Sequence, residues 1–138
     1  MNANVIEYIT EKAIFAEGMK SKVLTFLEYL NSRADDHYYP LTKISKITQL
    51  DSRSSVELAR FFCSNGVSLL EPRYIYIDFD GSVLEITKSD FNRGLKETTI
   101  GRGEFITDDS DTIEHFDKRR LKFYFVRRVE VVYEEVSW

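Results

Sequence analysis

The sequence predicts an α+β fold, with helices in its first half and β-strands in its second. Between residues 20 and 63, apolar residues recur at the helical spacing of three or four positions. From Tyr74 to Ile86 the period changes to two on either side of Asp80-Gly81, which is typical of a β-hairpin. Residues 123–133 are dominated by β-branched and aromatic side chains, which favour a strand.

The composition is that of a globular protein. The chain has 138 residues, of which 43% are hydrophobic and 14% aromatic, enough for a real hydrophobic core in one domain overall. Cys63 is the single cysteine, so it has no partner for an internal disulfide. The net charge of −4 disfavours a dedicated non-specific nucleic-acid binder, because such proteins are usually basic.

No targeting or membrane segment is expected. Glu7 and Glu11 interrupt the N-terminal region, which therefore lacks the apolar core of a signal peptide. No apolar run approaches the roughly 20 residues that cross a bilayer. We therefore expect a cytoplasmic protein without a membrane partner.

The first half of the chain is predicted to be helical. Residues 5–16 have near-helical apolar spacing up to Gly18, so residues 1–18 are expected to form a separate N-terminal helix. A cleaner helix is predicted over residues 20–30, with apolar residues at Val23, Phe26, Leu27 and Leu30.

A second pair of helices is predicted between Leu41 and Gly66. Thr42 is the expected N-cap of a short helix, and the next helix is expected to start near Ser52 or Ser54. Ser54 and Glu57 have the capping-box spacing, and Asn65-Gly66 is the expected stop.

The rest of the chain is predicted to be mostly β-structure. Asp80-Gly81 suits a two-residue type I′ turn, and Ser89 is expected to cap a short helix that ends at Leu95. Residues 98–111 are expected to form a loop, and Asp111 to open a short helix that reaches Arg120. Residues 123–133 are expected to form one long bent strand or two strands. Residues 95–138 would then be an extension packed on the core of 19–94.

The order helix, turn, helix and hairpin resembles the winged helix-turn-helix superfamily. The resemblance depends on this order, on the turn between Ile47 and Val56, and on Asp80-Gly81 as the tip of the wing. It covers about residues 19–87 and leaves residues 1–18 and 95–138 unexplained. It implies a module that binds DNA or another protein and rarely catalyses a reaction.

In superfamily members that bind DNA, the start of the second helix enters the major groove. The candidate nucleic-acid contacts here are Lys43, Lys46, Ser52, Arg53, Ser54 and Arg60. Arg53 could pair with a guanine edge, worth ~1–3 kcal/mol of discrimination, while the serines and lysines could hold phosphates. The alternative is that Glu57 forms surface ion pairs with Arg53 and Arg60, its neighbours on a helix.

Charges elsewhere give a mixed picture for DNA binding. The expected wing is acidic, and phosphate repulsion there would reduce affinity. The most basic stretch, residues 118–128, is interleaved with aromatics, which suits single-stranded nucleic acid. Arg119 and Arg120 are therefore further candidates, although the aromatics could instead face the core.

Evidence in the sequence for a catalytic or metal-binding site is weaker than that for a binding module. Residues 75–83, IYIDFDGSV, resemble the first motif of haloacid-dehalogenase phosphatases, which would make Asp78 the nucleophile and Asp80 the acid/base. Too little chain follows for the doubly wound sheet that such an enzyme needs. The acidic residues near Asp109 lack the glycine and spacing of a calcium loop. We therefore expect no catalytic residues, metal or cofactor.

Together these observations predict a non-catalytic winged-helix subunit or adaptor of a larger bacterial-type complex. Its partners would be one or more proteins, in a hetero-complex or a homodimer, with duplex DNA as a further partner and no small-molecule substrate. The alternative is a sequence-specific DNA-binding transcriptional regulator.

Overall fold

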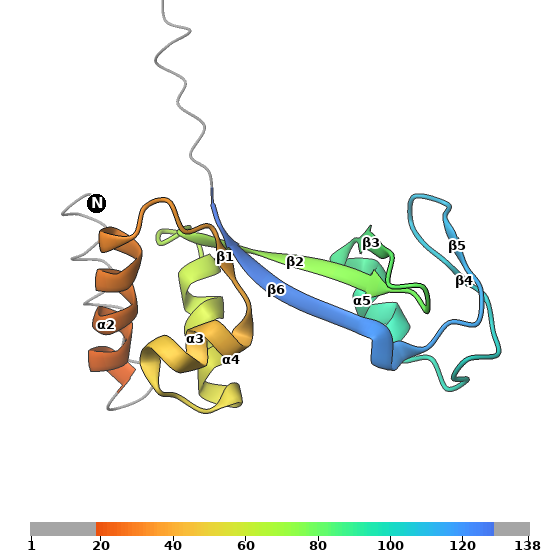
Figure 1. The fold of residues 1–138 in the computed structure, drawn as a ribbon, viewed down its shortest axis with the longest axis horizontal. Helices are drawn as coiled ribbons and strands as arrows, with labels where there is room; N and C mark the ends of the chain where they lie inside the picture. Colours follow the sequence, from red (N-terminus) through yellow and green to blue (C-terminus); the bar gives the residue numbers. More distant parts are fainter. Residues whose placement is uncertain (1–18, 129–138) are drawn as a thin grey trace, which may run out of the picture. The chain divides into compact units, whose positions relative to one another are not determined.

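The computed structural model describes residues 19–128 and divides them into two compact units (Figure 1). Unit 1 comprises residues 19–71 and 125–128, and unit 2 is Pro72–Tyr124. Four helices and an antiparallel sheet within the described residues confirm the α+β class. The helix expected over residues 5–16 and the strand expected beyond residue 128 lie outside the described residues.

Three helices form the body of unit 1: α2 (Met19–Ser32), α3 (Leu41–Thr48) and α4 (Ser52–Cys63) (Figure 1). Each turns an apolar stripe inward, as the spacing predicts. The fully buried side chains include Val23, Phe26, Leu30, Ile44, Leu58 and Phe62. The Phe26 ring meets those of Phe62 and Tyr39 edge to face, at centroid distances of 5.0 and 5.7 Å. The helices expected over residues 20–30 and between Leu41 and Gly66 are therefore confirmed.

The helix caps differ from those expected. Pro40 is the N-cap of α3 and forms no side-chain cap, so the prediction for Thr42 is wrong. Asp51 caps α4, since its carboxylate accepts a hydrogen bond from Ser54 N at 2.8 Å. The capping box expected at Ser54 is therefore wrong too, because the N-cap of α4 lies three residues earlier, at Asp51, and Ser54 is already inside the helix. Asp is as good an N-cap as Ser.

The tight turns of unit 1 use left-handed residues. Gln49, at φ 61°, ends α3, and its N–H is bonded to Ser45 O. Ser64 is the C-cap of α4, in extended conformation, and Gly66 follows at φ 92°. The expected stop at Asn65-Gly66 is thus correct to within two residues, with Gly66 supplying the positive φ.

Strands complete unit 1. β1 (Tyr38–Tyr39) pairs antiparallel with β6 (Leu121–Arg127), with Tyr38 opposite Val126 and Tyr39 opposite Phe125. The strand order of the sheet is β1-β6-β2-β3, where β2 is Leu70–Ile77 and β3 is Val83–Ile86. Residues of β2 and β6 belong to both units.

Arg127 ties β6 to the end of α2. Its guanidinium donates to four oxygens, at 2.9–3.1 Å: the carbonyls of Leu30, Arg33 and Asp36 and the hydroxyl of Tyr39. The last carbonyls of a helix have no partner within it and carry partial negative charge, so a cation suits this position.

Unit 2 contains the rest of β2, β3, α5 (Lys88–Leu95), the short strands β4 (Phe105–Ile106) and β5 (Thr112–Ile113), and a 3₁₀ turn at Lys118–Arg120 (Figure 1). Its core consists of Tyr76, Phe105, Ile113, Phe116 and Leu121. The Phe116 ring is stacked between Phe105 and Tyr76, at centroid distances of 4.6 and 5.2 Å.

The hairpin at Asp80-Gly81 is confirmed, but its turn is not type I′. Gly81 has a positive φ of 84°, whereas Asp80 is not among the residues with positive φ. Gly81 N donates to Asp78 O, and Asp78 N donates to Ser82 O. The connection is thus three residues long, a form in which only the last residue must be left-handed.

Two other predictions in unit 2 are wrong. Thr87, not Ser89, caps α5, and forms a full capping box with Asp90. The helix expected from Asp111 to Arg120 is absent, since Thr112 and Ile113 form β5 against β4. Pairing with β4 buries Ile113 in the core, which outweighs the local helix signal. The expected loop 98–111 accordingly includes β4, although the end of α5 at Leu95 is as predicted.

The contacts divide the described residues at Pro72 and Tyr124. Among residues 19–128, no helix is both long and apolar enough to cross a membrane.

Candidate nucleic-acid interface

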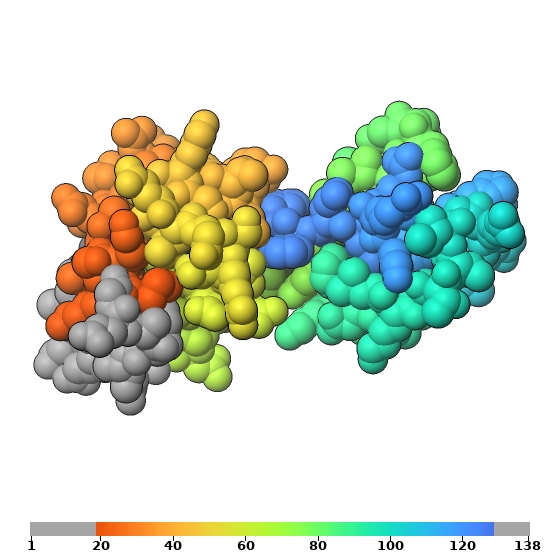
Figure 2. All heavy atoms as spheres, turned by 90° about the horizontal axis from the view of Figure 1, so that it is seen from below, coloured from red at the N-terminus to blue at the C-terminus, as the bar shows by residue number. Residues whose placement is uncertain are grey.

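Six of the candidate nucleic-acid contacts lie on α3 and α4. The atoms coloured yellow in Figure 2 belong to this part of unit 1. Ser45 on α3 and the buried Ser55 on α4 share a hydrogen bond of 2.8 Å between their hydroxyls, which joins the two helices. Ser52 and Arg53 occupy the first turn of α4 and are exposed, Ser54 is half-buried, and Arg60 lies exposed in the last turn.

Lys43 is held by unit 1 itself. Its ammonium forms an ion pair with Asp36, donates to Tyr38 O at 2.9 Å and lies 4.6 Å from the centre of the Tyr39 ring. The hydrogen bond from Lys43 is the main reason why the pKa of Asp36 lies below its usual value. A phosphate would therefore have to compete with Asp36 for this lysine.

Lys46, Arg53 and Arg60 are the cations left on this surface. All three are exposed, and within residues 19–128 none forms an ion pair. The expected pairing of Glu57 with Arg53 and Arg60 is therefore wrong: neighbouring positions on a helix permit such a pair, but exposed charges gain little from it. Arg53 is consequently available to a ligand.

The start of α4 also carries an anion. Asp51 is exposed, and the hydrogen bond from Ser54 N keeps its pKa below the usual value, so the carboxylate is charged at neutral pH. It occupies the orphan N–H that a phosphate at this helix end would otherwise use.

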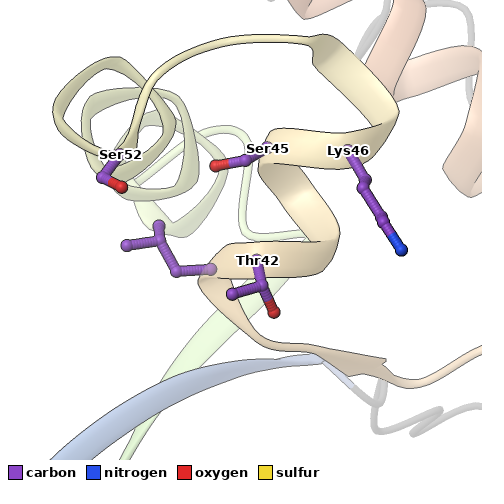
Figure 3. Close-up of a pocket in the computed structure, with 5 residues that line it drawn as sticks. Thr42, Ser45, Lys46 and Ser52 are labelled. Atoms are coloured by element: carbon purple, nitrogen blue, oxygen red, sulfur yellow. The ribbon is translucent and has the colours of Figure 1, made fainter.

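A hollow of about 330 Å³ lies between α3 and the start of α4. Its lining residues are Leu41, Thr42, Ser45, Lys46 and Ser52 (Figure 3). The Ser45 hydroxyl points toward the side of the hollow where Ser52 lies, whereas the Lys46 side chain points away from Ser52. The hollow thus presents hydroxyls and Leu41, with its one cation directed outward.

Thr42 and Ser45 belong to this site but are not among the residues that the sequence predicts for it. The sequence predicts Thr42 as a helix cap and indicates no role for Ser45. The signal that identifies them is their i, i+3 spacing, which places both hydroxyls on one side of α3.

The candidates Arg119 and Arg120 lie in unit 2, and both are engaged there. Arg119 binds the Asp117 carboxylate through Nε and Nη2, with bonds of 3.0 and 2.9 Å, and these bonds lower the pKa of Asp117. The Arg120 guanidinium lies 4.0 Å from the centre of the Phe79 ring. The alternative interpretation, in which aromatics of this basic stretch face the core, holds for Phe123, which packs on Phe91 of α5.

Acidic residues of unit 2 stabilise its loops. The Asp108 carboxylate accepts from the Thr87 hydroxyl at 2.6 Å and from Arg93 at 3.3 Å, while its N–H donates to Asp90 at 2.8 Å. Asp78 and Asp80 accept from N–H groups of their own hairpin loop, and β2 is antiparallel to β3, unlike the parallel strand that the phosphatase motif follows.

Comparison with known protein families, curated proteins and solved structures finds no match to this chain.

Proposed function

We propose that the chain is a non-catalytic winged-helix adaptor that binds a protein partner. The three helices of unit 1, with a tight turn between α3 and α4, support the helix-turn-helix assignment. β1 precedes α3 in the sequence. β2 and β6 follow α4, and each has some of its residues in unit 1.

The wing requires a new assignment under this proposal. In the sheet, β6 lies between β1 and β2. The two strands of the wing are then β2 and β6, which are neighbours in the sheet and follow α4 in the sequence. The β2–β3 hairpin, which the sequence suggests as the wing, has its turn in unit 2. In the sequence, unit 2 is then an insertion between the two strands of the wing.

The charge of the α3–α4 surface is the observation that carries the proposal. Lys43 forms an ion pair with Asp36, and the surface that carries the three remaining cations also carries two carboxylates, those of Glu57 on α4 and of Asp51, its N-cap. Tight DNA binding depends on neutralising many phosphates. A protein partner has no such requirement, and a hollow of hydroxyls and Leu41 suits one.

Salt dependence tests this proposal. Binding of a mixed-sequence DNA duplex is measured by fluorescence anisotropy at several salt concentrations. With three available cations, the slope of log K against log salt should be no steeper than about −3, and binding should be weak at physiological salt. A steeper slope with nanomolar affinity would contradict the adaptor.

Partner capture is the second arm of this test. A photo-crosslinking amino acid at Thr42 or Ser52 should give a discrete protein adduct in the native cell, and the same group at Asp109 in unit 2 serves as the control. Absence of any adduct from Thr42 or Ser52 would count against a protein-facing α3–α4 surface.

The second candidate is a sequence-specific DNA-binding regulator. It is favoured by Arg53, which is exposed in the first turn of α4, where base edges are read, and forms no ion pair with any residue between 19 and 128. Selection from a random duplex library should then enrich one motif, and Arg53→Ala should relax specificity at one position at a cost of about 1–3 kcal/mol. Arg73→Ala, in unit 2, is the control.

A further inference from the structure

β3 is an edge strand, because it ends the strand order β1-β6-β2-β3 and only β2 is bonded to it. The opposite edge strand, β1, has two residues, and such short edge strands are one means by which proteins prevent further pairing. β3 has four residues, contains neither proline nor lysine, and carries a single charge, at Glu85. It therefore lacks most of the features that protect the edge of a sheet.

The hydrogen bonds between β2 and β3 decide which backbone groups of β3 face outward. Asp78 N donates to Ser82 O at 2.9 Å, and bonded pairs alternate with unbonded pairs along an antiparallel ladder. The register therefore makes Leu84 and Ile86 the residues of β3 that are bonded to β2. The N–H and C=O groups of the other two residues point away from β2.

Val83 and Glu85 supply these outward-facing groups. Within residues 19–128, no hydrogen bond reaches the N–H or the C=O of either residue, so the edge offers two donors and two acceptors. Both side chains are exposed, that of Val83 to 59%. A strand beside β3 would be bonded by all four groups, which is how extended segments add to the edge of a sheet.

The other side of β3 is incompletely covered as well. Leu84 and Ile86 pack on the core of unit 2, but each remains only half-buried at the edge of that core. Successive side chains of a strand point to opposite faces, so these two lie opposite Val83 and Glu85. A further strand would extend the core beyond β3 and shield both side chains.

A second copy of the chain fits this edge in one register. Antiparallel pairing about a two-fold axis must place outward-facing residues opposite one another. If Glu85 lay opposite the partner's Glu85, two like charges would meet, and if Val83 lay opposite the partner's Val83, Ile86 would lie against the hairpin loop. With Val83 opposite the partner's Glu85, all of β3 is paired and four N–H···O bonds form.

We propose that two copies of this chain pair antiparallel through β3, with Val83 opposite the partner's Glu85. The two Leu84 side chains then lie side by side at the axis, on the core side of each strand, so that each covers the other. A strand of another protein is the competing occupant. The second copy is favoured because one register satisfies the backbone groups, avoids like charges and covers Leu84. The proposal goes beyond the adaptor function and does not depend on it.

Sedimentation equilibrium of the full chain at several concentrations measures the Kd of this dimer. Val83→Lys places an ammonium opposite the partner's Glu85, and with two such pairs per dimer it should lower the Kd about 2- to 30-fold. Val83→Glu places like charges there and should raise the Kd by a similar factor. Ile106→Glu is the matched control, since Ile106 is 58% exposed on β4, and it should leave the Kd unchanged.

A proline tests the backbone bonds. Glu85→Pro removes an outward N–H but no bond to β2, a position at which edge strands tolerate proline. It should raise the Kd at least about fivefold. Glu85→Ala, which keeps the N–H, is the matched control and should have a smaller effect. The methyl signals of Ile113, in the core of unit 2, should be unchanged in both variants, which checks that unit 2 remains folded.

Hydrogen exchange reports on the edge directly. The amides of Val83 and Glu85 should be protected only at concentrations above the Kd, because their N–H groups are bonded only in the dimer. The amide of Leu84, which is bonded to β2, should be protected at every concentration.

Three results would overturn the proposal: a monomer at every concentration, a dimer whose Kd neither Val83 substitution changes, or a change in the same direction with Val83→Lys and Val83→Glu, which would indicate another register. If the chain alone is a monomer but the Val83 and Glu85 amides become protected in an extract of its native cell, the edge binds a strand of another protein instead.

Failure of this dimer is distinguishable from failure of the adaptor proposal. The crosslinks from Thr42 and Ser52 report on the α3–α4 surface, which contains no residue of β3. If the dimer is absent and those crosslinks form, the adaptor stands. If the crosslinks are absent and the dimer forms, the adaptor fails and the β3 pairing stands.

Discussion

Asp90 holds α5 to the β4–β5 hairpin, and its replacement by alanine tests how unit 2 is stabilised. The side chain is 1% exposed. Its carboxylate accepts from Thr87 N at 3.1 Å, Asp108 N at 2.8 Å and Arg93 Nη2 at 2.7 Å. These bonds connect the N-cap of α5, its last turn and the start of the loop between β4 and β5.

The cost of Asp90→Ala follows from the groups it leaves behind. The N–H groups of Thr87 and Asp108 lose their acceptor, at about 1–3 kcal/mol each where water does not replace it. Arg93 is half-exposed and turns to water, so its ion pair adds little. We therefore expect unit 2 to lose about 3–5 kcal/mol of unfolding free energy, close to the range for breaking a buried pair.

The assay is urea denaturation followed by NMR, with the methyl signals of Ile113 reporting on unit 2 and those of Ile44 on unit 1. Asp109→Ala, an exposed change in the same loop, is the control and should stay within about 0.5 kcal/mol of wild type. A loss below about 1 kcal/mol for Asp90→Ala would refute the reasoning that this carboxylate is an essential acceptor.

Four further outcomes are expected. Acidification should destabilise the protein. Burial of Asp90 opposes ionisation, but hydrogen bonds outweigh it, and hydrogen bonds likewise hold the pKa of Asp36 below its usual value in the folded state. The stability that these two carboxylates contribute is therefore complete above their unfolded pKa of about 3.9 and is lost as the pH falls through their folded pKa values. Arg127→Leu should cost unit 1 about 2–4 kcal/mol in urea denaturation, because four oxygens lose their donor. Gly94→Ala should cost unit 2 about 1–3 kcal/mol, since a Cβ would lie 2.9 Å from Leu121 and from Phe116. Alkylation of Cys63 by iodoacetamide at neutral pH should be at least about tenfold slower than that of free cysteine, because burial raises its thiol pKa to about 11.

Each of these outcomes has a contrary result. Unchanged stability between neutral pH and pH about 2 would contradict the contribution of the two carboxylates. An Arg127→Leu variant whose unfolding free energy equals that of wild type would mean that water replaces the guanidinium. Gly81→Ala is a useful companion to Gly94→Ala, because the added Cβ would have no neighbour within 4 Å and only the positive φ of 84° would resist it. Alkylation of Cys63 at the rate of free cysteine would show that the thiol is accessible.

Elements whose signals are local could be predicted from the sequence. The apolar periods of residues 20–30 and 41–63 locate α2, α3 and α4, because one stripe of each helix must be buried. Caps were less predictable: Asp51, Ser52 and Ser54 are all good N-caps, and only the observed start of α4 distinguishes them. The β2–β3 hairpin was predictable from Asp80-Gly81, whereas its turn type depended on whether Asp80 also takes a positive φ.

Long-range pairing could not be predicted in this way. β1 pairs with β6, more than eighty positions later, and no periodicity within either strand names its partner. The role of Arg127 is hidden for the same reason, since its four acceptors lie between Leu30 and Tyr39. At the candidate interface, sequence identified Arg53 and Arg60 as exposed helix cations, but the ion pair that removes Lys43 links it to Asp36 outside the helix.

The position of β6 has a consequence for biosynthesis. Translation adds Arg127 and the strand that pairs with β1 only after the whole of Pro72–Tyr124 has been made. On the ribosome, α2, α3 and α4 therefore remain without the unit 1 part of β6 until Pro72–Tyr124 has been synthesised. Unit 2 is free to fold first, and β6 then completes unit 1 by pairing with β1.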